Sequence, residues 1–210
     1  MISFSIHGVG VSSGIAIGQA HLVSNALLEV VHYQLPKHLI DDEIQRFNSA
    51  IATVQTDLEL IHSSLRSNSP AELSAFIGTH LMMLADKSLS ETPKDIIRNE
   101  QCNAEWAIKL QMDEIVDQFE QIEDEYLRER KQDVIQVVER VIKVLLGHPS
   151  QLTTEQQSTA SNQERKRIVV DHYLSPADAY QFKQQQLGPV IKEIGGGTSI
   201  NAVMTRSLNL

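Results

Sequence analysis

The stretch Glu-Ile-Gly-Gly-Gly-Thr-Ser-Ile-Asn-Ala-Val-Met-Thr-Arg-Ser-Leu, residues 193–208, decides how the rest of the chain is interpreted. It has the pattern of a strand end, a glycine loop and the start of a helix. Three consecutive glycines at 195–197 let backbone amides approach a ligand closely, and Thr198 or Ser199 can cap the helix. Because amides at a helix N-terminus bind phosphate, the stretch predicts a phosphate-binding loop. On these residues alone, a helix start that merely packs against a strand stays an open alternative.

The same stretch resembles the phosphohistidine loop of Enzyme I, the phosphoenolpyruvate-protein phosphotransferase of the bacterial sugar phosphotransferase system. That family reads Gly-Gly-Arg-Thr-Ser-His, then three varied positions, then Met or Val, Ala and Arg-Ser-Leu. The matching positions are Gly195, Gly196, Thr198, Ser199, Met204, Arg206, Ser207 and Leu208. Two positions differ, since Gly197 stands where the family has Arg and Ile200 where it has the phospho-accepting His. An isoleucine offers no nucleophile, so we expect this chain alone to be inactive in phosphoryl transfer.

The resemblance also implies which residues would surround the phosphoryl group. They are Gly195, Gly196 and Gly197 through their amides, Thr198, Ser199, Ser175 close by, and Ile200 at the acceptor position. The family's catalytic barrel, which binds phosphoenolpyruvate and Mg²⁺, would follow beyond Leu210. We therefore expect no cofactor and no metal in this chain. We also expect the last strands of the α/β domain beyond Leu210, which would leave an unpaired sheet edge here.

Composition limits the classes of function. The chain has 210 residues, 18 basic and 27 acidic side chains and a net charge of -9, which repels nucleic acid and favours a basic partner. Its single cysteine, Cys102, excludes an intrachain disulfide framework. The first residues lack the features of a signal peptide, and no apolar run is long enough to cross a membrane. We expect a cytoplasmic protein that does not bind membranes.

The middle of the chain has helical periodicity. One apolar stripe, at alternating steps of three and four, consists of Ile44, Phe47, Ile51, Val54, Leu58, Ile61 and Leu65. Residues 67–70 break it, and a second helix is expected up to Leu84. A less regular piece at 88–99 and helices at 104–121 and 123–146 complete a predicted bundle.

The two ends of the chain have β character. Residues 4–23 alternate apolar residues with glycines and predict short strands, and residues 8–18 resemble the start of Enzyme I. After a polar segment at 148–166, strands are expected at 167–170 and 190–191, with a helix from Ser175 between them.

This order predicts an α+β or α/β fold, with an α/β domain at 1–30 and 148–210 and a helical insertion at 31–147. It is the layout of the N-terminal half of Enzyme I. There a swivelling phosphohistidine-type α/β domain holds a helical subdomain that docks the histidine-containing phosphocarrier protein. Pyruvate phosphate dikinase has a similar phosphohistidine domain without this insertion, so the insertion favours Enzyme I.

Two helical segments carry the resemblance to the docking subdomain. Residues 71–86 resemble its Gly-His-Ile-Met-Leu-Leu helix, and residues 123–134 resemble its Asp-Asp-Glu-Tyr-Leu-Lys-Glu-Arg segment. The partner contacts carried over from them are Glu72, Ala75, His80, Met82, Met83, Asp86, Phe119, Leu127 and Arg130. The alternatives are that the methionines belong to the bundle core and that the charges form a solvated, salt-bridged face.

The leading hypothesis is therefore the N-terminal part of a phosphoenolpyruvate-protein phosphotransferase, which by family passes phosphate to the phosphocarrier for sugar uptake. Its relay is expected to be broken at Ile200. The alternative is a non-catalytic module that binds the phosphocarrier without phosphotransfer. A weaker third reading is a structural fragment with no partner.

Overall fold

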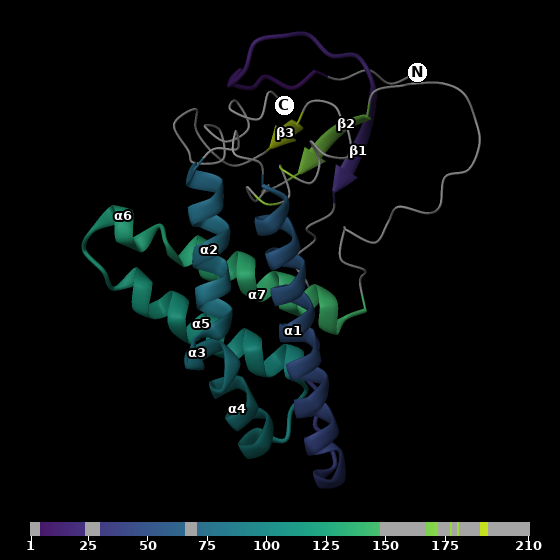
Figure 1. Ribbon diagram of the computed structural model, residues 1–210, viewed down its shortest axis with the longest axis vertical. Helices are drawn as coiled ribbons and strands as arrows, with labels where there is room; N and C mark the ends of the chain where they lie inside the picture. The colour runs from purple at the N-terminus through teal and green to yellow at the C-terminus, as the bar shows by residue number, and fades with distance from the viewer. Residues whose placement is uncertain are drawn as a thin grey trace, which may run out of the picture. The chain divides into compact units, whose positions relative to one another are not determined.

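The computed structural model of the chain describes residues 5–23, 30–65, 71–147, 167–171, 177, 180 and 190–192. The chain divides into two compact units, residues 1–25 with 160–210 and residues 26–159. The described elements are mostly helices, all the long ones lying in the second unit, with a small sheet in the first (Figure 1). Within the described part of the chain, no helix combines the length and apolar character that crossing a bilayer requires.

The sheet consists of β1 (Gln19–Val23), β2 (Arg167–Asp171) and β3 (Val190–Lys192). All its pairings are parallel, in the order β1-β2-β3, and Val169 of the middle strand pairs with Val190. Val169 is fully buried, as expected for a residue flanked by strands on both sides. The predicted strands in the two terminal segments are thus confirmed at 19–23, 167–171 and 190–192.

The strand prediction fails for residues 5–18, which contain no strand. Gly14 has a φ of 143°, a conformation that favours glycine and interrupts an extended run. Ile15 and Ile17 are 97% and 89% exposed, so no buried face selects a pairing register. Alternation in the sequence is therefore insufficient here to produce a strand.

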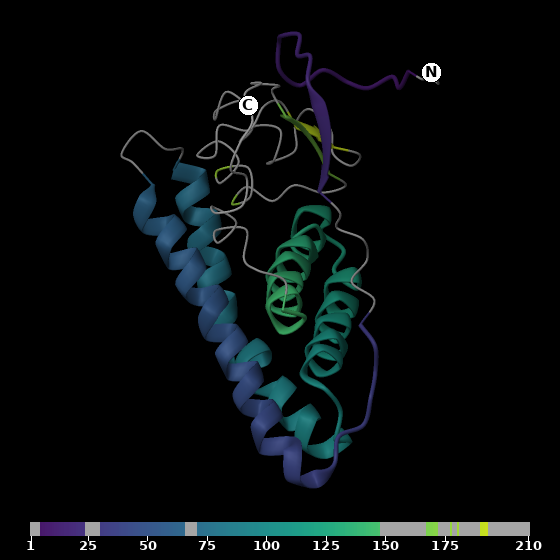
Figure 2. The same cartoon turned by 90° about the vertical axis from the view of Figure 1, so that its right-hand side faces the viewer.

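The helical unit begins with a short 3-10 turn, η1 (Lys37–Leu39), which leads into α1 (Ile40–Ser64). The predicted apolar stripe is confirmed from Ile44 to Ile61, with Phe47 and Leu58 fully buried, whereas Leu65 follows the end of α1 and is only partly buried. The helix α2 (Ala71–Ala85) packs along α1, and the two run side by side in Figure 2.

The remaining helices are α3 (Lys87–Ser90), α4 (Thr92–Glu100), α5 (Ala104–Glu120), α6 (Glu125–Arg128) and α7 (Lys131–Leu145). α5 packs against α4 and α7, and α7 also contacts α1 and α2. Gly147, with a φ of 73°, follows the end of α7 as a C-terminal glycine commonly does.

The single helix predicted at 123–146 is two helices in the structure. Asp124 caps α6 by accepting a hydrogen bond from the Leu127 amide at 3.0 Å. No residue of α6 is buried, whereas α7 buries a continuous face that begins at Asp133 and Val134. The two segments therefore differ in orientation because only the second has an apolar stripe to bury.

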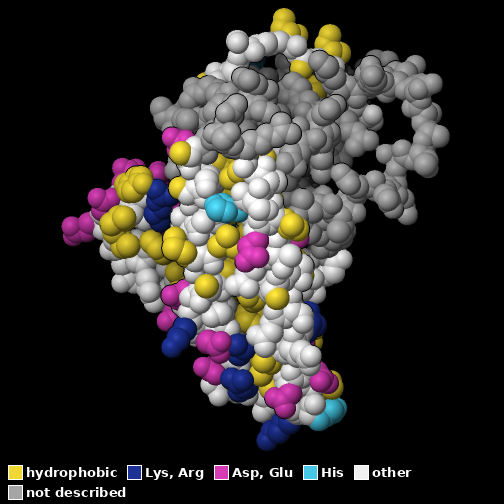
Figure 3. Space-filling model, in the orientation of Figure 1, with side chains coloured by type: hydrophobic (Ala, Val, Ile, Leu, Met, Phe, Trp, Pro, Cys, Tyr) yellow, Lys and Arg dark blue, Asp and Glu magenta, His cyan; other side chains and the backbone are white. Residues whose placement is uncertain are grey.

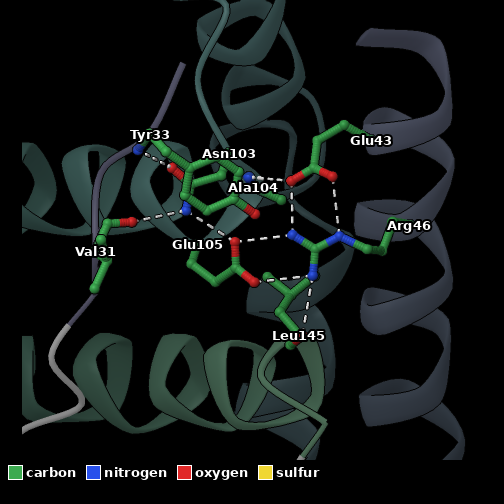
Figure 4. Close-up of polar contacts among 8 residues, drawn as sticks. All are labelled: Val31, Tyr33, Glu43, Arg46, Asn103, Ala104, Glu105 and Leu145. Carbon is green, nitrogen blue, oxygen red and sulfur yellow. Dashed lines mark hydrogen bonds and ion pairs between the residues drawn. The ribbon is translucent and has the colours of Figure 1, made fainter. Parts of the chain in front are cut away.

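A polar network joins three helices of this unit (Figure 4). Arg46 of α1 donates hydrogen bonds to both carboxylate oxygens of Glu43, to both of Glu105 on α5, and to the Leu145 carbonyl at the end of α7. These five bonds are 2.6–3.0 Å long and use every N–H of the guanidinium. The Glu43 and Glu105 side chains are only 9% and 7% exposed.

Asn103 extends the network to the segment that precedes α1. Its side-chain amide donates to Glu105 and to the Val31 carbonyl, both at 3.0 Å, and its carbonyl oxygen accepts from the Tyr33 amide at 3.1 Å. Gln34 forms an isolated antiparallel bridge with Cys102 next to it. Arg46 and Asn103 thus hold residues 31–34 and three helices together.

Candidate functional site

The predicted phosphate site lies outside the described residues. This holds for Gly195, Gly196, Gly197, Thr198, Ser199, Ile200 and Ser175. The phosphate-binding loop therefore stays a prediction from the sequence. The described residues do include every position carried over as a partner contact, and the site is built from these.

The α2 helix presents an exposed stripe. Glu72, Ala75 and Met82 are exposed and follow helical steps of three and seven residues, so they lie on one face, and the exposed Asp86 follows directly after the end of α2. Met82 is 68% exposed, which is unusual for a large apolar side chain, and Met83 beside it is partly exposed. Methionines on a surface adapt to the shape of a partner. The alternative that Met82 belongs to the bundle core is excluded by its exposure.

His80 requires a correction. Its side chain is fully buried, and its ring centroid lies 4.1 Å from that of Phe76 on the same helix. A side chain without exposed surface offers no atom to a docking protein. His80 therefore belongs to the interior of the helical unit and not to a partner surface.

The second part of the site is α6 and its flanks. Tyr126 and Leu127 are 61% and 48% exposed, and Phe119 near the end of α5 is partly exposed. Figure 3 shows hydrophobic side chains gathered over α6 and along α2 on one face, with acidic side chains at the border of the α6 cluster. Glu125, the first residue of α6, and Glu129, which follows its last residue, are both exposed.

Arg130, at the start of α7, is held by two neighbours. It donates one hydrogen bond to the Tyr126 hydroxyl and one of 3.3 Å to Asp133, and its Cζ lies 4.7 Å from the centroid of the Tyr126 ring. Burial alone would lower the pKa of Arg130, but the hydrogen bonds that it donates to Tyr126 and Asp133 outweigh this effect and raise the pKa. Arg130 therefore stays charged while its guanidinium is fixed.

Two acidic groups, Asp86 in the site and Glu120 next to Phe119 in the chain, are held by local contacts. Ser88 donates its hydroxyl and its backbone amide to the Asp86 carboxylate, and these bonds lower the pKa of Asp86. Glu120 pairs with Lys131, whose hydrogen bond lowers the pKa of Glu120. Asp86 and Glu120 therefore remain anionic at neutral pH.

We call the set Glu72, Ala75, Met82, Met83, Asp86, Phe119, Tyr126, Leu127 and Arg130 the α2–α6 surface. It combines exposed apolar side chains with acidic groups and a single fixed arginine. Such a composition suits a protein partner with an apolar patch and basic groups, since charge guides approach and apolar contacts set the lifetime.

Tyr126 is the one member of the surface that the sequence did not predict. Its exposure and its contacts with Arg130 become visible only in the structure. The four-residue spacing of an aromatic residue and an arginine was the available signal. A continuous helix over 123–146 would contain the same four-residue spacing. The spacing alone therefore did not identify Tyr126 as part of the surface.

The sequence matches that of known proteins over nearly its whole length. The family described as PEP-utilising enzyme, N-terminal, matches residues 7–130. A phosphoenolpyruvate-protein phosphotransferase of Cupriavidus necator is 41% identical over 209 residues, which are 99% of this chain and 36% of that protein. The corresponding protein of Bacillus subtilis is 31% identical over 211 residues, covering 98% of this chain and 34% of its own length. The chain thus spans about a third of the length of these relatives.

Two solved structures have the same fold. The NMR solution structure of Enzyme I (nEIt) superimposes with a TM-score of 0.75 at 28% identity, covering 97% of this chain and 79% of that one. The N-terminal domain of Enzyme 1 - Nitrogen gives a TM-score of 0.68 over 94% of this chain and 78% of the other, and at 20% identity it supports the fold alone.

Proposed function

The chain belongs to the family of PEP-utilising enzymes, as an N-terminal region of the Enzyme I type, and we propose that its helical unit docks a histidine-containing phosphocarrier protein. The observation that carries the proposal is the α2–α6 surface. Met82, Tyr126 and Leu127 are 68%, 61% and 48% exposed, whereas the apolar stripes of α1 and α7 are buried. Exposed apolar side chains bordered by charge mark a protein interaction site.

We also propose that this chain does not accept the phosphoryl group. Residues 1–30 and 148–210 would form the phosphohistidine-type α/β domain of the family, with Ile200 at the acceptor position. A hydrocarbon side chain has no lone pair to attack phosphorus. In an Enzyme I relay this break would stop transfer, so Ile200 favours the second candidate function, a module that binds the phosphocarrier without phosphotransfer.

The docking proposal is tested by titrating the chain with the unphosphorylated phosphocarrier in a calorimeter. We expect a dissociation constant in the micromolar range, and about a tenfold increase for Met82→Ala, the loss typical of an apolar anchor. Leu60→Ala is the matched control, because Leu60 is 56% exposed but lies on α1, outside the α2–α6 surface. Equal effects of the two substitutions, or no heat with a folded chain, would contradict the docking surface.

The two candidate functions are separated by restoring the acceptor. Ile200→His and the unchanged chain are incubated with phosphocarrier that carries a labelled phosphohistidine. We expect label on the Ile200→His chain only, and Ile200→Gln serves as a polar control without a nucleophilic nitrogen. Label on the unchanged chain would show that another residue accepts the phosphoryl group and would contradict the non-catalytic proposal.

A further inference from the structure

Arg130 has an arrangement that its ordinary role as a surface charge does not require. Tyr126 contacts it twice, with its hydroxyl on one terminal nitrogen and with its ring face near Cζ at 4.7 Å. Asp133 binds the other terminal nitrogen at 3.3 Å. These partners come from both sides of the α6–α7 turn, so the guanidinium is held where the two helices meet.

The arrangement leaves donors available. A guanidinium has five N–H groups, and among the described residues Arg130 donates only to Tyr126 and Asp133. Its side chain is 34% exposed. A free arginine loses roughly 2 kcal/mol of rotamer entropy when it is fixed, and a contact that fixes it in advance removes this cost from binding.

We propose that Tyr126 is a positioning residue, which orients Arg130 so that its remaining N–H groups receive an oxygen acceptor of the docked phosphocarrier. The acceptor is a carboxylate or a carbonyl oxygen, the groups that a planar guanidinium binds. Tyr126 acts through Arg130 in this proposal, in addition to any apolar contact of its ring. The inference rests on the proposed function, because it assigns a role within that docking surface.

A double-mutant cycle tests the inference. Tyr126→Phe keeps the ring and removes only the hydroxyl, and we expect it to weaken phosphocarrier binding about three- to tenfold, as loss of one hydrogen bond does. In the Arg130→Ala background the same change is expected to have no effect, since nothing is left to position. A loss of equal size in both backgrounds would show that the hydroxyl acts on the partner directly, and would overturn the proposal. Because Tyr126 is 61% exposed, we expect Tyr126→Phe to keep the melting temperature of the chain.

A second measurement needs no partner. Relaxation of the Arg130 side-chain Nε–H in the free chain is expected to show restricted motion, which increases in Tyr126→Phe. Arg98, whose side chain is 52% exposed and pairs only with Asp95 among the described residues, is the control that does not change. Unaltered Arg130 motion in Tyr126→Phe would overturn the positioning role. Restricted Arg130 motion in a chain that does not bind the phosphocarrier would instead support positioning and contradict the proposed function.

Discussion

Arg46 and Arg130 are exposed to nearly the same extent but differ in how their hydrogen-bond donors are used. Their side chains are 35% and 34% exposed, so burial does not distinguish them. Arg46 uses all five N–H groups on Glu43, Glu105 and the Leu145 carbonyl, whereas Arg130 uses two on described residues. A guanidinium whose donors are all satisfied internally holds a fold together, while one that is fixed and only partly satisfied is available for recognition.

The carboxylates beside the two arginines show the same contrast. Desolvation raises the pKa of Glu105, but hydrogen bonds from Arg46 and Asn103 outweigh it, so the net pKa of Glu105 is lowered. Desolvation also raises the pKa of Asp133, and there the single bond from Arg130 does not compensate, so its pKa stays raised. The Arg46 network therefore favours the ionised form of Glu105, whereas the surroundings of Asp133 disfavour its ionised form.

The largest expected effect comes from breaking the satisfied arginine. Arg46→Met leaves Glu43 and Glu105 as unpaired charges with 9% and 7% exposure. Breaking a buried ion pair costs roughly 3–5 kcal/mol, and we expect about 2–3 kcal/mol here because water reaches the exposed third of Arg46. Urea unfolding followed by circular dichroism measures the change.

The matched control for this substitution is Arg98→Met. Arg98 and Asp95 form a pair in which both side chains are more than half exposed, at 52% and 66%. Such pairs contribute about 0–1 kcal/mol. A similar loss for Arg46→Met and Arg98→Met would show that the internal network is not what holds α1, α5 and α7 together.

Asn103→Ala is expected to have the next largest effect. Asn103 is 1% exposed and joins Glu105 to the backbone of Val31 and Tyr33. Its removal should lower the free energy of unfolding by about 1–2 kcal/mol, the cost of leaving buried polar groups unpaired. Hydrogen exchange at the Tyr33 amide should accelerate as well.

Asn99→Ala provides the comparison for Asn103→Ala, since Asn99 is exposed on α4. Surface substitutions change stability by about 0.5 kcal/mol or less. Protection of the Tyr33 amide that survives in Asn103→Ala would mean that the Gln34–Cys102 bridge alone secures residues 31–34.

Lowering the pH should weaken the Arg46 network by protonating Glu105. Its folded-state pKa is lowered, so its stabilising contribution is complete above the unfolded pKa of about 4.3 and is lost as pH falls through the folded value. Urea unfolding from pH 6 to pH 3 should therefore show a steeper loss for the unchanged chain than for Glu105→Gln. Parallel pH dependences would contradict the assignment.

The sequence predicted the parts of the fold that depend on long periodic patterns. The α1 stripe from Ile44 to Ile61 was confirmed because an apolar face that repeats over about five turns is buried only if the segment is a helix. The break between α6 and α7 was missed because charged residues at 123–131 are compatible with a continuous helix and only the absence of a buried face separates them. The strand prediction for residues 5–18 failed for a similar reason, because an alternating sequence forms a strand only where a neighbouring surface covers one of its faces.

For the site, the family resemblance proposed Met82, Leu127, Arg130 and His80 alike as partner contacts. The first three are exposed or partly exposed, whereas His80 is buried. His80 lies two residues from Met82, and side chains two positions apart in a helix point to nearly opposite faces. Which side chain faces inward depends on how α2 packs against α1 and α7, and this depends on residues far apart in the sequence.

The smallest expected effect on stability is that of Asp133→Asn. The folded-state pKa of Asp133 is raised, so its contribution is complete below the unfolded pKa of about 3.9 and is lost as pH rises through the folded value. At pH 7 the neutral amide avoids the desolvation of a charge but weakens the bond to Arg130, and we expect a net change of about 0.5 kcal/mol or less. The pH dependence of unfolding should change in the direction opposite to that of Glu105→Gln, which serves as its counterpart. A loss at pH 7 as large as that of Arg46→Met would mean that Arg130 also acts as a structural arginine, and the contrast between the two would no longer hold.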